Sequence, residues 1–81
     1  MEKFALLFEI REKSQVLVYR EYDPEEDTTT VHHIASFNGC NVDAKVGLSG
    51  DNQEENSDKY LQEYTQEKAE KFYTEMEKML S

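Results

Sequence analysis

Both histidines and the single cysteine of the chain lie within one stretch, VHHIASFNGCNVDAKV, at residues 31–46. Imidazole and thiolate groups are the usual ligands of zinc, and a thiol beside an imidazole base is a common catalytic nucleophile. The spacing, two adjacent histidines and a cysteine seven positions after the second, matches no zinc pattern. In a strand, His32 and His33 point to opposite faces and do not bind one ion together. We therefore expect no metal, no cofactor and no catalytic residue, with His33 buried or half-buried and Cys40 a small apolar residue at a turn.

The same stretch has the features of a β-hairpin. Asn-Gly between two alternating segments is typical of a type I′ turn, which needs positive φ at both central residues. With Asn38 and Gly39 in the turn, apolar residues oppose one another on one face and polar residues share the other. The turn and the pattern agree on one register. It pairs Phe37 with Cys40, Ala35 with Val42, His33 with Ala44 and Val31 with Val46.

Two earlier segments also alternate as strands do. Residues 4–11 place an apolar side chain at every second position, and QVLVYREY, at residues 15–22, is rich in β-branched and aromatic residues. A tight loop at residues 12–14 between them predicts Phe8 opposite Val18 and Ile10 opposite Val16. The next residues, DPEEDT at 23–28, contain the only proline and predict a turn.

A long helix is predicted for the last third of the chain. Ser57 or Asn56 is a suitable N-cap, and residues 58–80 are rich in Glu, Lys, Gln, Met and Leu. Apolar residues recur on one side of this helix at helical spacing, which predicts that it covers a sheet. They are Leu61, Tyr64, Ala69, Phe72, Met76 and Met79.

Together these elements predict an α+β fold, a four-stranded antiparallel β-meander with one long C-terminal α-helix packed across one face. The 81 residues suffice for a single domain, 1–81, with the sheet at about 3–48, an acidic loop at 49–57 and the helix at about 58–80. The predicted core joins the inward side of the sheet to the apolar side of the helix. It contains Phe4, Leu6, Phe8, Ile10, Val16, Val18, Val31, Ala35, Phe37, Val42, Val46, Leu61, Phe72 and Met76.

One helix covers one face of a sheet, so the composition of the other face is informative. Five apolar residues are expected there among polar neighbours. Contiguous exposed apolar surface is typical of an interface, and a two-fold homodimer is its commonest use, whereas scattered apolar residues need no explanation. We predict a protein interface formed by Ala5, Leu7, Leu17, Tyr19 and Ile34.

Acidic residues outnumber basic residues by 18 to 9, which gives a net charge of -9. This charge disfavours direct binding to nucleic acid or to anionic membranes. In a meander the second turn and the exit from the fourth strand lie at one end of the sheet, where two acidic loops would meet and attract Ca²⁺ or a basic partner. A dedicated calcium loop has alternating Asp or Asn ligands that these loops lack, which favours a solvated surface. The predicted acidic surface comprises Asp23, Glu25, Glu26, Asp27, Asp51, Glu54, Glu55, Glu63, Glu67 and Glu70.

The composition also bears on location. The longest apolar run at the N-terminus, residues 4–8, is too short for a signal peptide or a membrane span. One cysteine forms no internal disulfide, which is consistent with a reducing compartment. We expect a cytoplasmic protein that does not bind a membrane.

These observations leave three functions. The first is a small non-enzymatic interaction module that dimerises or binds a protein partner through the open sheet face. The second is an acidic inhibitor or nucleic-acid mimic, of the kind that phages or mobile elements encode, which binds a basic nucleic-acid-binding protein. The third is an enzyme or small-ligand binder with a pocket near His33 and Tyr64. It ranks last, because the sequence has no phosphate loop, no nucleophile and base at matching positions, and no metal set.

Overall fold

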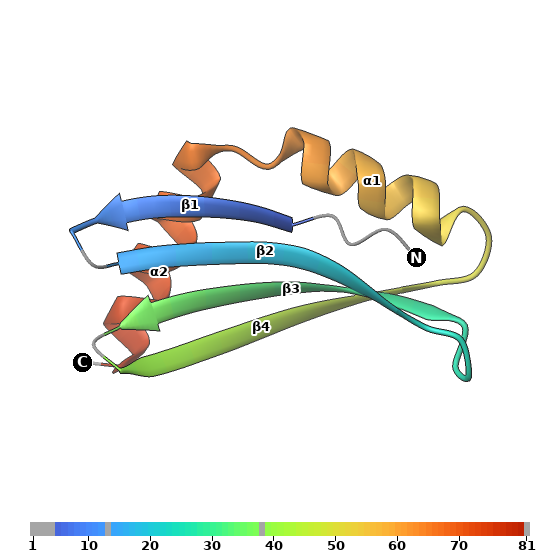
Figure 1. The fold of residues 1–81 in the computed structure, drawn as a ribbon, viewed down its shortest axis with the longest axis horizontal. Helices are drawn as coiled ribbons and strands as arrows, with labels where there is room; N and C mark the ends of the chain where they lie inside the picture. Colours follow the sequence, from blue (N-terminus) through green and yellow to red (C-terminus); the bar gives the residue numbers. More distant parts are fainter. Residues whose placement is uncertain (1–4, 13, 38, 81) are drawn as a thin grey trace.

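The structure is a computed structural model that describes residues 5–12, 14–37 and 39–80; Phe4 of the predicted core and Asn38 of the predicted turn lie outside the described residues. Its elements are β1 (Ala5–Arg11), β2 (Ser14–Asp23), β3 (Thr28–Phe37), β4 (Cys40–Ser49), α1 (Gln53–Glu63) and α2 (Gln66–Leu80). The fold is α+β: the four strands form one antiparallel sheet in the order β1-β2-β3-β4, and two helices follow it (Figure 1). The described residues contain no helix with the length and apolar composition that a membrane crossing requires.

The hairpin of β3 and β4 has the predicted register. Phe37 is opposite Cys40, His33 is opposite Ala44, and the pairing continues without a bulge to Thr28 and Ser49. Gly39 in the turn has a φ of 89°, a conformation that glycine adopts without a steric penalty. The turn sequence therefore determined which side chains of this hairpin share a face.

The predicted register of β1 and β2 is wrong by two residues. Phe8 is opposite Val16, not Val18, and the pairing shifts between Glu9 and Arg11. The irregularity at Ile10 adds one residue to β1, and the loop is shorter than expected because Arg11 already pairs with Ser14. The alternation is unaffected up to Glu9, so the inward and outward sides of β1 are those that the sequence predicts.

The helical region contains two helices, not the single helix predicted at about 58–80. Tyr64 has an extended backbone (φ -76°, ψ 128°) and ends α1. Thr65 then caps α2, because its hydroxyl oxygen accepts a hydrogen bond from the Lys68 amide at 3.3 Å and its carbonyl accepts one from the Ala69 amide at 3.0 Å. Threonine caps a helix well, so the Tyr64-Thr65 pair favours a break at this point.

The first helix also begins earlier than predicted. It starts at Gln53, inside the expected loop at 49–57, and its N-cap is Asn52, not Asn56 or Ser57. Asn52 has a φ of 67°, a conformation that asparagine tolerates better than most residues. Ser57 is instead fully buried within the helix.

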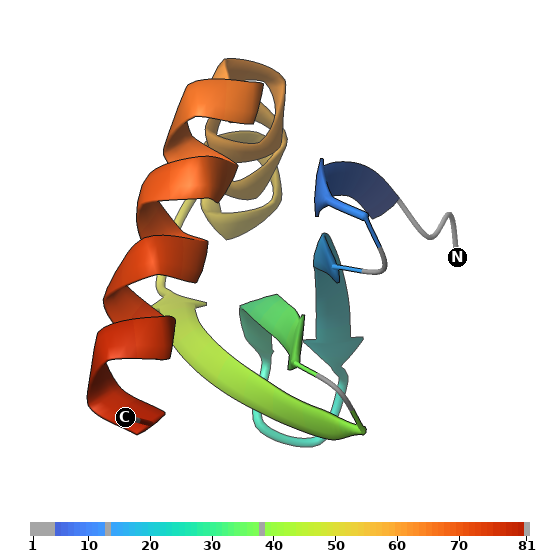
Figure 2. The same cartoon turned by 90° about the vertical axis from the view of Figure 1, so that its left-hand side faces the viewer.

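The break lets the two helices follow the twist of the sheet. Both lie on the same side of it (Figure 2). The first helix packs against β2, β3 and β4, and the second packs against β1 and β3. We call this side of the sheet the covered face and the other side the open face.

The core lies between the covered face and the helices. Its central residues are Val16, Val18, Val31, Ala35, Leu61, Ala69 and Tyr73, with Leu6, Phe8, Ile10, Phe37, Leu48, Tyr64, Phe72 and Met76 packed against them. Tyr73 was not predicted; its ring stacks on Phe37 at 4.5 Å, and its hydroxyl lies 2.9 Å from the Ser14 hydroxyl. Two residues of the predicted core, Val42 and Val46, are not part of it, and Met79 of the predicted apolar side of the helix is also misplaced. Val42 is only half-buried. Val46 is 43% exposed because it lies on the outermost strand, and Met79 is 76% exposed, one residue from the end of α2.

Candidate functional site

The predicted interface residues lie together on the open face. Leu7 is opposite Leu17, and Leu17 is opposite Ile34, so these three side chains form one row across β1, β2 and β3. Ala5 and Tyr19 begin the next row. Leu7 is 58% exposed, because no helix of the described chain lies on this side (Figure 2).

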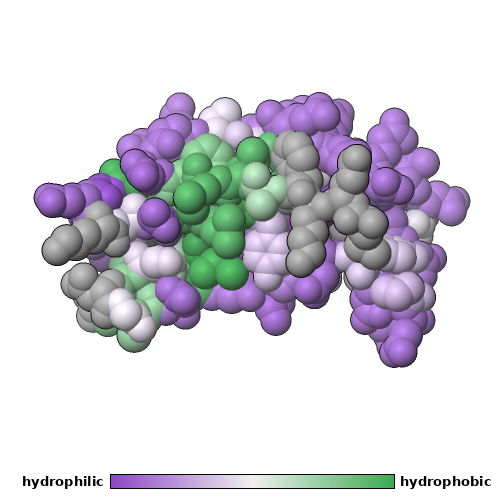
Figure 3. Space-filling model, viewed as in Figure 1, coloured by the Kyte–Doolittle hydropathy of each residue, from purple (hydrophilic) through white to green (hydrophobic). Residues whose placement is uncertain are grey.

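This arrangement gives a continuous apolar area. Hydrophobic side chains gather in the middle of the open face, over the strands, with polar side chains around them (Figure 3). We call the five residues Ala5, Leu7, Leu17, Tyr19 and Ile34 the open-face patch. A contiguous patch of this kind differs from the single apolar residues that are normal on a protein surface.

A histidine lies beside the patch in an unusual environment. His32 is on the open face, but it is only 7% exposed because its ring stacks on Tyr19 with the centroids 4.6 Å apart and the planes at 8°. Its Nδ1 lies 3.2 Å from Asp43 Oδ2, and its Nε2 lies 3.7 Å from Glu21 Oε1. Among the described residues Nε2 has no hydrogen-bond partner. His32 therefore stacks on Tyr19 and lies beside two carboxylates at the border of the patch.

The second histidine is on the covered face, as the alternation predicts. His33 is packed among Tyr60, Tyr64 and Phe72, with ring centroids between 5.5 and 5.7 Å away. Its Nδ1 lies 3.2 Å from the Ala44 carbonyl oxygen, which only accepts, so Nδ1 carries the proton. Its Nε2 then accepts a hydrogen bond from the Tyr60 hydroxyl at 2.6 Å. Both nitrogens are satisfied within the core.

Burial changes the acid–base properties of this cluster. It lowers the pKa of His33, which favours the neutral ring. It raises the pKa of Tyr60, and it raises the pKa of Tyr64 to about 12. All three groups are therefore neutral near pH 7. Aromatic rings fill the space near His33 and Tyr64 where the third function would need a pocket.

We expect His33 to titrate below the ordinary histidine value of about 6.5. The unfolded chain binds a proton at this residue as the pH falls through about 6.5, whereas the folded chain does not, so the stability of the fold should decrease from pH 7.5 to pH 5.5. Proton NMR of the imidazole rings measures the titration, with His33→Gln assigning the resonance. Urea unfolding should show a weaker pH dependence in His33→Gln than in the parent over this range. A His33 midpoint above 6.5 would contradict the assignment of a neutral ring.

The acidic surface is divided between two places. The turn after β2 is held by Asp23, whose Oδ1 accepts hydrogen bonds from the Glu25 and Glu26 amides at 3.0 and 3.4 Å. Gln53 Nε2 donates to the Asp27 carbonyl oxygen at 2.9 Å, which joins this turn to the start of α1. Both acidic segments are thus at one end of the sheet, although Glu54 and Glu55 are in the first turn of α1, not in a loop.

The remaining acidic residues do not form one line along one helix. Glu63 ends α1, whereas Glu67 and Glu70 belong to α2, and the extended Tyr64 separates them. Asp51 lies before α1, and it and the three glutamates are exposed. Among the described residues no group of three or more His, Cys, Asp or Glu side chains has a geometry that could hold a metal ion. Cys40 is exposed and makes no disulfide.

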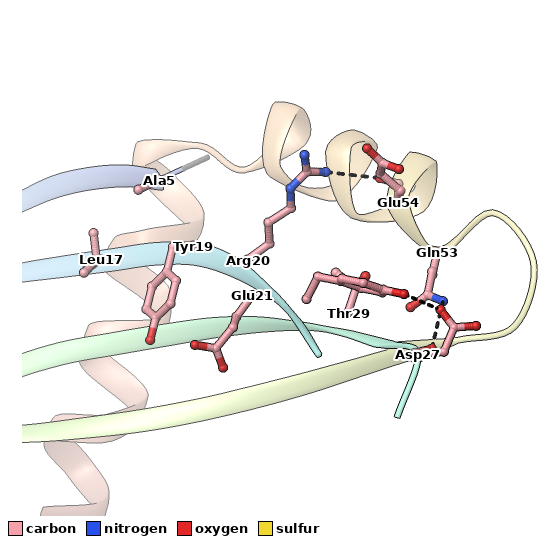
Figure 4. A pocket seen from close by; sticks show the side chains of 10 residues that line it. Ala5, Leu17, Tyr19, Arg20, Glu21, Asp27, Thr29, Gln53 and Glu54 are labelled. Atoms are coloured by element: carbon pink, nitrogen blue, oxygen red, sulfur yellow. Dashed lines mark hydrogen bonds between the residues drawn. The ribbon is translucent and has the colours of Figure 1, made fainter. Parts of the chain in front are cut away.

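A cavity of about 670 Å³ adjoins the patch where β2 extends beyond the start of β1 (Figure 4). Ala5, Leu17 and Tyr19 of the patch line it on one side. Its polar lining groups bind one another: Arg20 Nη1 donates to the Glu54 carbonyl oxygen at 3.4 Å, and Gln53 binds Asp27. The cavity therefore extends the apolar surface, and Glu21 and Glu54 add carboxylates to its lining.

Arg20 is a half-buried charged residue that was not predicted. Its side chain is only 14% exposed and forms an ion pair with Asp58, and its Nη1 lies 3.2 Å from Ser57 Oγ. A signal was present in the sequence: Arg20 continues the series of Val16 and Val18, so the alternation places it on the covered face. A charged residue in the apolar phase of a strand indicates a buried partner on the element that covers it.

Comparison with protein-family models, with curated protein sequences and with solved structures found no match.

Proposed function

We propose that the protein is a small, non-enzymatic interaction module that binds a protein partner through the open-face patch. The observation that supports this most is the row of Leu7, Leu17 and Ile34, an apolar strip across three strands that no described helix or strand covers. Its side chains project from a regular sheet, which presents a preformed surface to a partner. The adjoining cavity gives the same surface a depression that an anchor side chain can enter.

The border of the patch indicates what the partner carries. Glu9, Glu21 and Asp43 are on the open face beside the apolar row, and Lys45 is the basic residue there among the described side chains. Two copies meeting face to face would bring these carboxylates together, which is unfavourable. A partner with an apolar centre and Lys or Arg around it suits the surface better than a second copy bound in this way.

The test places a photo-crosslinking amino acid at Leu7 in one variant and at Glu70 in another, and captures the partner from cells. The captured partner is then purified, and its affinity is measured for designed variants. Leu17→Asp places a charge at the centre of the row, and we expect it to weaken binding by about tenfold or more. Leu17 is half-buried on the open face and outside the core between sheet and helices, so circular dichroism should show an unchanged fold. Glu70→Lys, on the exposed side of α2, is the matched control and should keep the affinity of the parent.

The opposite result would exclude this surface. Equal affinity of Leu17→Asp and the parent, with crosslinks from Glu70 and not from Leu7, would mean that the partner binds the helices. The same outcome would favour the second candidate below.

The second candidate is an acidic inhibitor that occupies the basic site of a nucleic-acid-binding protein. The observation that favours it is that the acidic turn after β2 lies beside the acidic start of α1. The hydrogen bond between Gln53 and Asp27 connects them. Its affinity should fall steeply with salt, and charge reversal at Glu25 and Glu26 should reduce it. Charge reversal at Glu63 and Glu67 tests the helical part of this surface. An affinity unchanged in high salt would argue against this candidate.

A further inference from the structure

The edge of the sheet formed by β4 is the feature that the proposed function does not use. Ten residues, Cys40–Ser49, pair with β3 on one side, and no described element lies along their other side (Figure 1). The strand contains no proline, and its pairing has no bulge. Strand edges in natural proteins are usually shortened, bulged or covered, because an open edge has a row of free N–H and C=O groups.

We propose that this edge pairs with the β4 edge of a second copy, in antiparallel orientation, to form a continuous eight-stranded sheet. The partner is another copy of this chain because the side chains of β4 are complementary to themselves in this orientation. A two-fold axis perpendicular to the sheet relates the copies, so both open faces lie on the same side of the dimer.

The charges of β4 select one register. Directly opposed residues of antiparallel strands share a face, so a two-fold register is centred on a residue that opposes itself. Centring on Asp43 or on Lys45 brings like charges together, which is destabilising. Centring on Val42 or Val46 leaves both charged side chains without an opposite charge. Only the register centred on Ala44 places each Asp43 opposite the Lys45 of the other copy, and it does so twice.

The other face of the strand fits the same register. Centring on Ala44 places Val42 opposite Val46 and Cys40 opposite Leu48, so every directly opposed pair on the covered face is apolar. Val46 is 43% exposed in the single chain, and the second strand would cover it. One register therefore satisfies the charges on the open face and the apolar residues on the covered face.

The charged groups are available for this contact. Asp43 uses Oδ2 for His32 at 3.2 Å, which leaves Oδ1 for a lysine across the axis. Lys45 is exposed and forms no ion pair within the described part of the chain. Its position opposite His32 keeps it on the open face beside Asp43.

The first measurement is the molar mass by light scattering and sedimentation equilibrium. Concentrations from about 10 µM to about 1 mM are needed, because a contact between two strand edges is a small interface. We expect a dimer in the parent and a dissociation constant at least about tenfold higher in both Lys45→Glu and Asp43→Lys, since each replaces two attractive pairs by two repulsive ones. Lys59→Glu, which makes the same charge change on the exposed side of α1, should dimerise as the parent does.

Two complementation experiments separate this register from a general effect of charge. Mixing Lys45→Glu with Asp43→Lys restores both opposite pairs in the heterodimer, so the mixture should associate although each variant alone does not. The double variant Asp43→Lys with Lys45→Asp exchanges the charges and should dimerise again. A parent that is monomeric over the whole range, a dimer insensitive to Lys45→Glu, or no association in the mixture would each overturn the proposal. None of these outcomes bears on partner binding, which Leu17→Asp tests on the open face.

Discussion

Replacing Leu61 by alanine is expected to lower the free energy of unfolding by about 2–5 kcal/mol. Leu61 is 1% exposed and lies in the centre of the core with Val16, Val18 and Val31. Removing its side chain leaves a cavity between α1 and the sheet that neighbouring side chains fill only in part. A domain of this size has a total stability of about 4–12 kcal/mol, so the variant should lose a large share of it.

Urea unfolding followed by circular dichroism measures this loss. Met79→Ala is the matched control, because Met79 was assigned to the same apolar stripe from the sequence but is 76% exposed. Its effect should stay within about 0.5 kcal/mol. Equal losses in the two variants would contradict the position of α1 on the sheet.

Replacing Arg20 by methionine is expected to lower the free energy of unfolding by about 2 kcal/mol. Methionine keeps most of the apolar length of the side chain but removes the guanidinium, which binds Asp58, Ser57 and the Glu54 carbonyl group. The arginine side chain is 14% exposed, so water has little access to the groups that the guanidinium binds and replaces its hydrogen bonds poorly. The Asp58 side chain is 43% exposed and can turn to solvent, which limits the loss.

Arg11→Met is the control for this substitution. Arg11 pairs with Glu77 at 3.6 Å, but its side chain is 61% exposed, and its loss should cost less than about 1 kcal/mol. A double-mutant cycle of Arg20→Met and Asp58→Asn gives the coupling between the two partners. Additive effects of the two substitutions would show that Arg20 does not act through Asp58.

The parts of the fold that were predicted correctly depend on local signals. Asn38 and Gly39 define a turn of known length, and a two-residue turn determines the register of every pair beyond it. The first hairpin has no such turn sequence, and a shorter loop together with the irregularity at Ile10 shifted its register by two residues. Alternation predicts which face a strand residue occupies, but it does not determine the length of the loop that sets the register.

The helical region shows a different limit. Periodicity predicted the inward positions of Leu61, Ala69 and Phe72, but it missed Tyr73 and placed the exposed Met79 inward. It also continues across Tyr64 and Thr65 without a visible interruption. The break depends on whether one straight helix or two shorter ones fit the twisted sheet, and this is decided by packing across the whole domain. Arg20 was missed for a related reason, since its partners Ser57 and Asp58 are more than thirty positions away in the chain.

The meander also has a consequence for how the chain folds. Each strand pairs only with the strand before or after it in the chain, and the connections are turns of a few residues. Closing short loops requires little loss of chain entropy, and hairpins form within about 1–10 µs. We therefore expect the three hairpins to form early and the two helices to dock afterwards, with slow hydrogen exchange in β2 and β3 and faster exchange in α1 and α2. During synthesis the strands emerge before the helices, so the future core face of the sheet stays exposed until α1 and α2 follow.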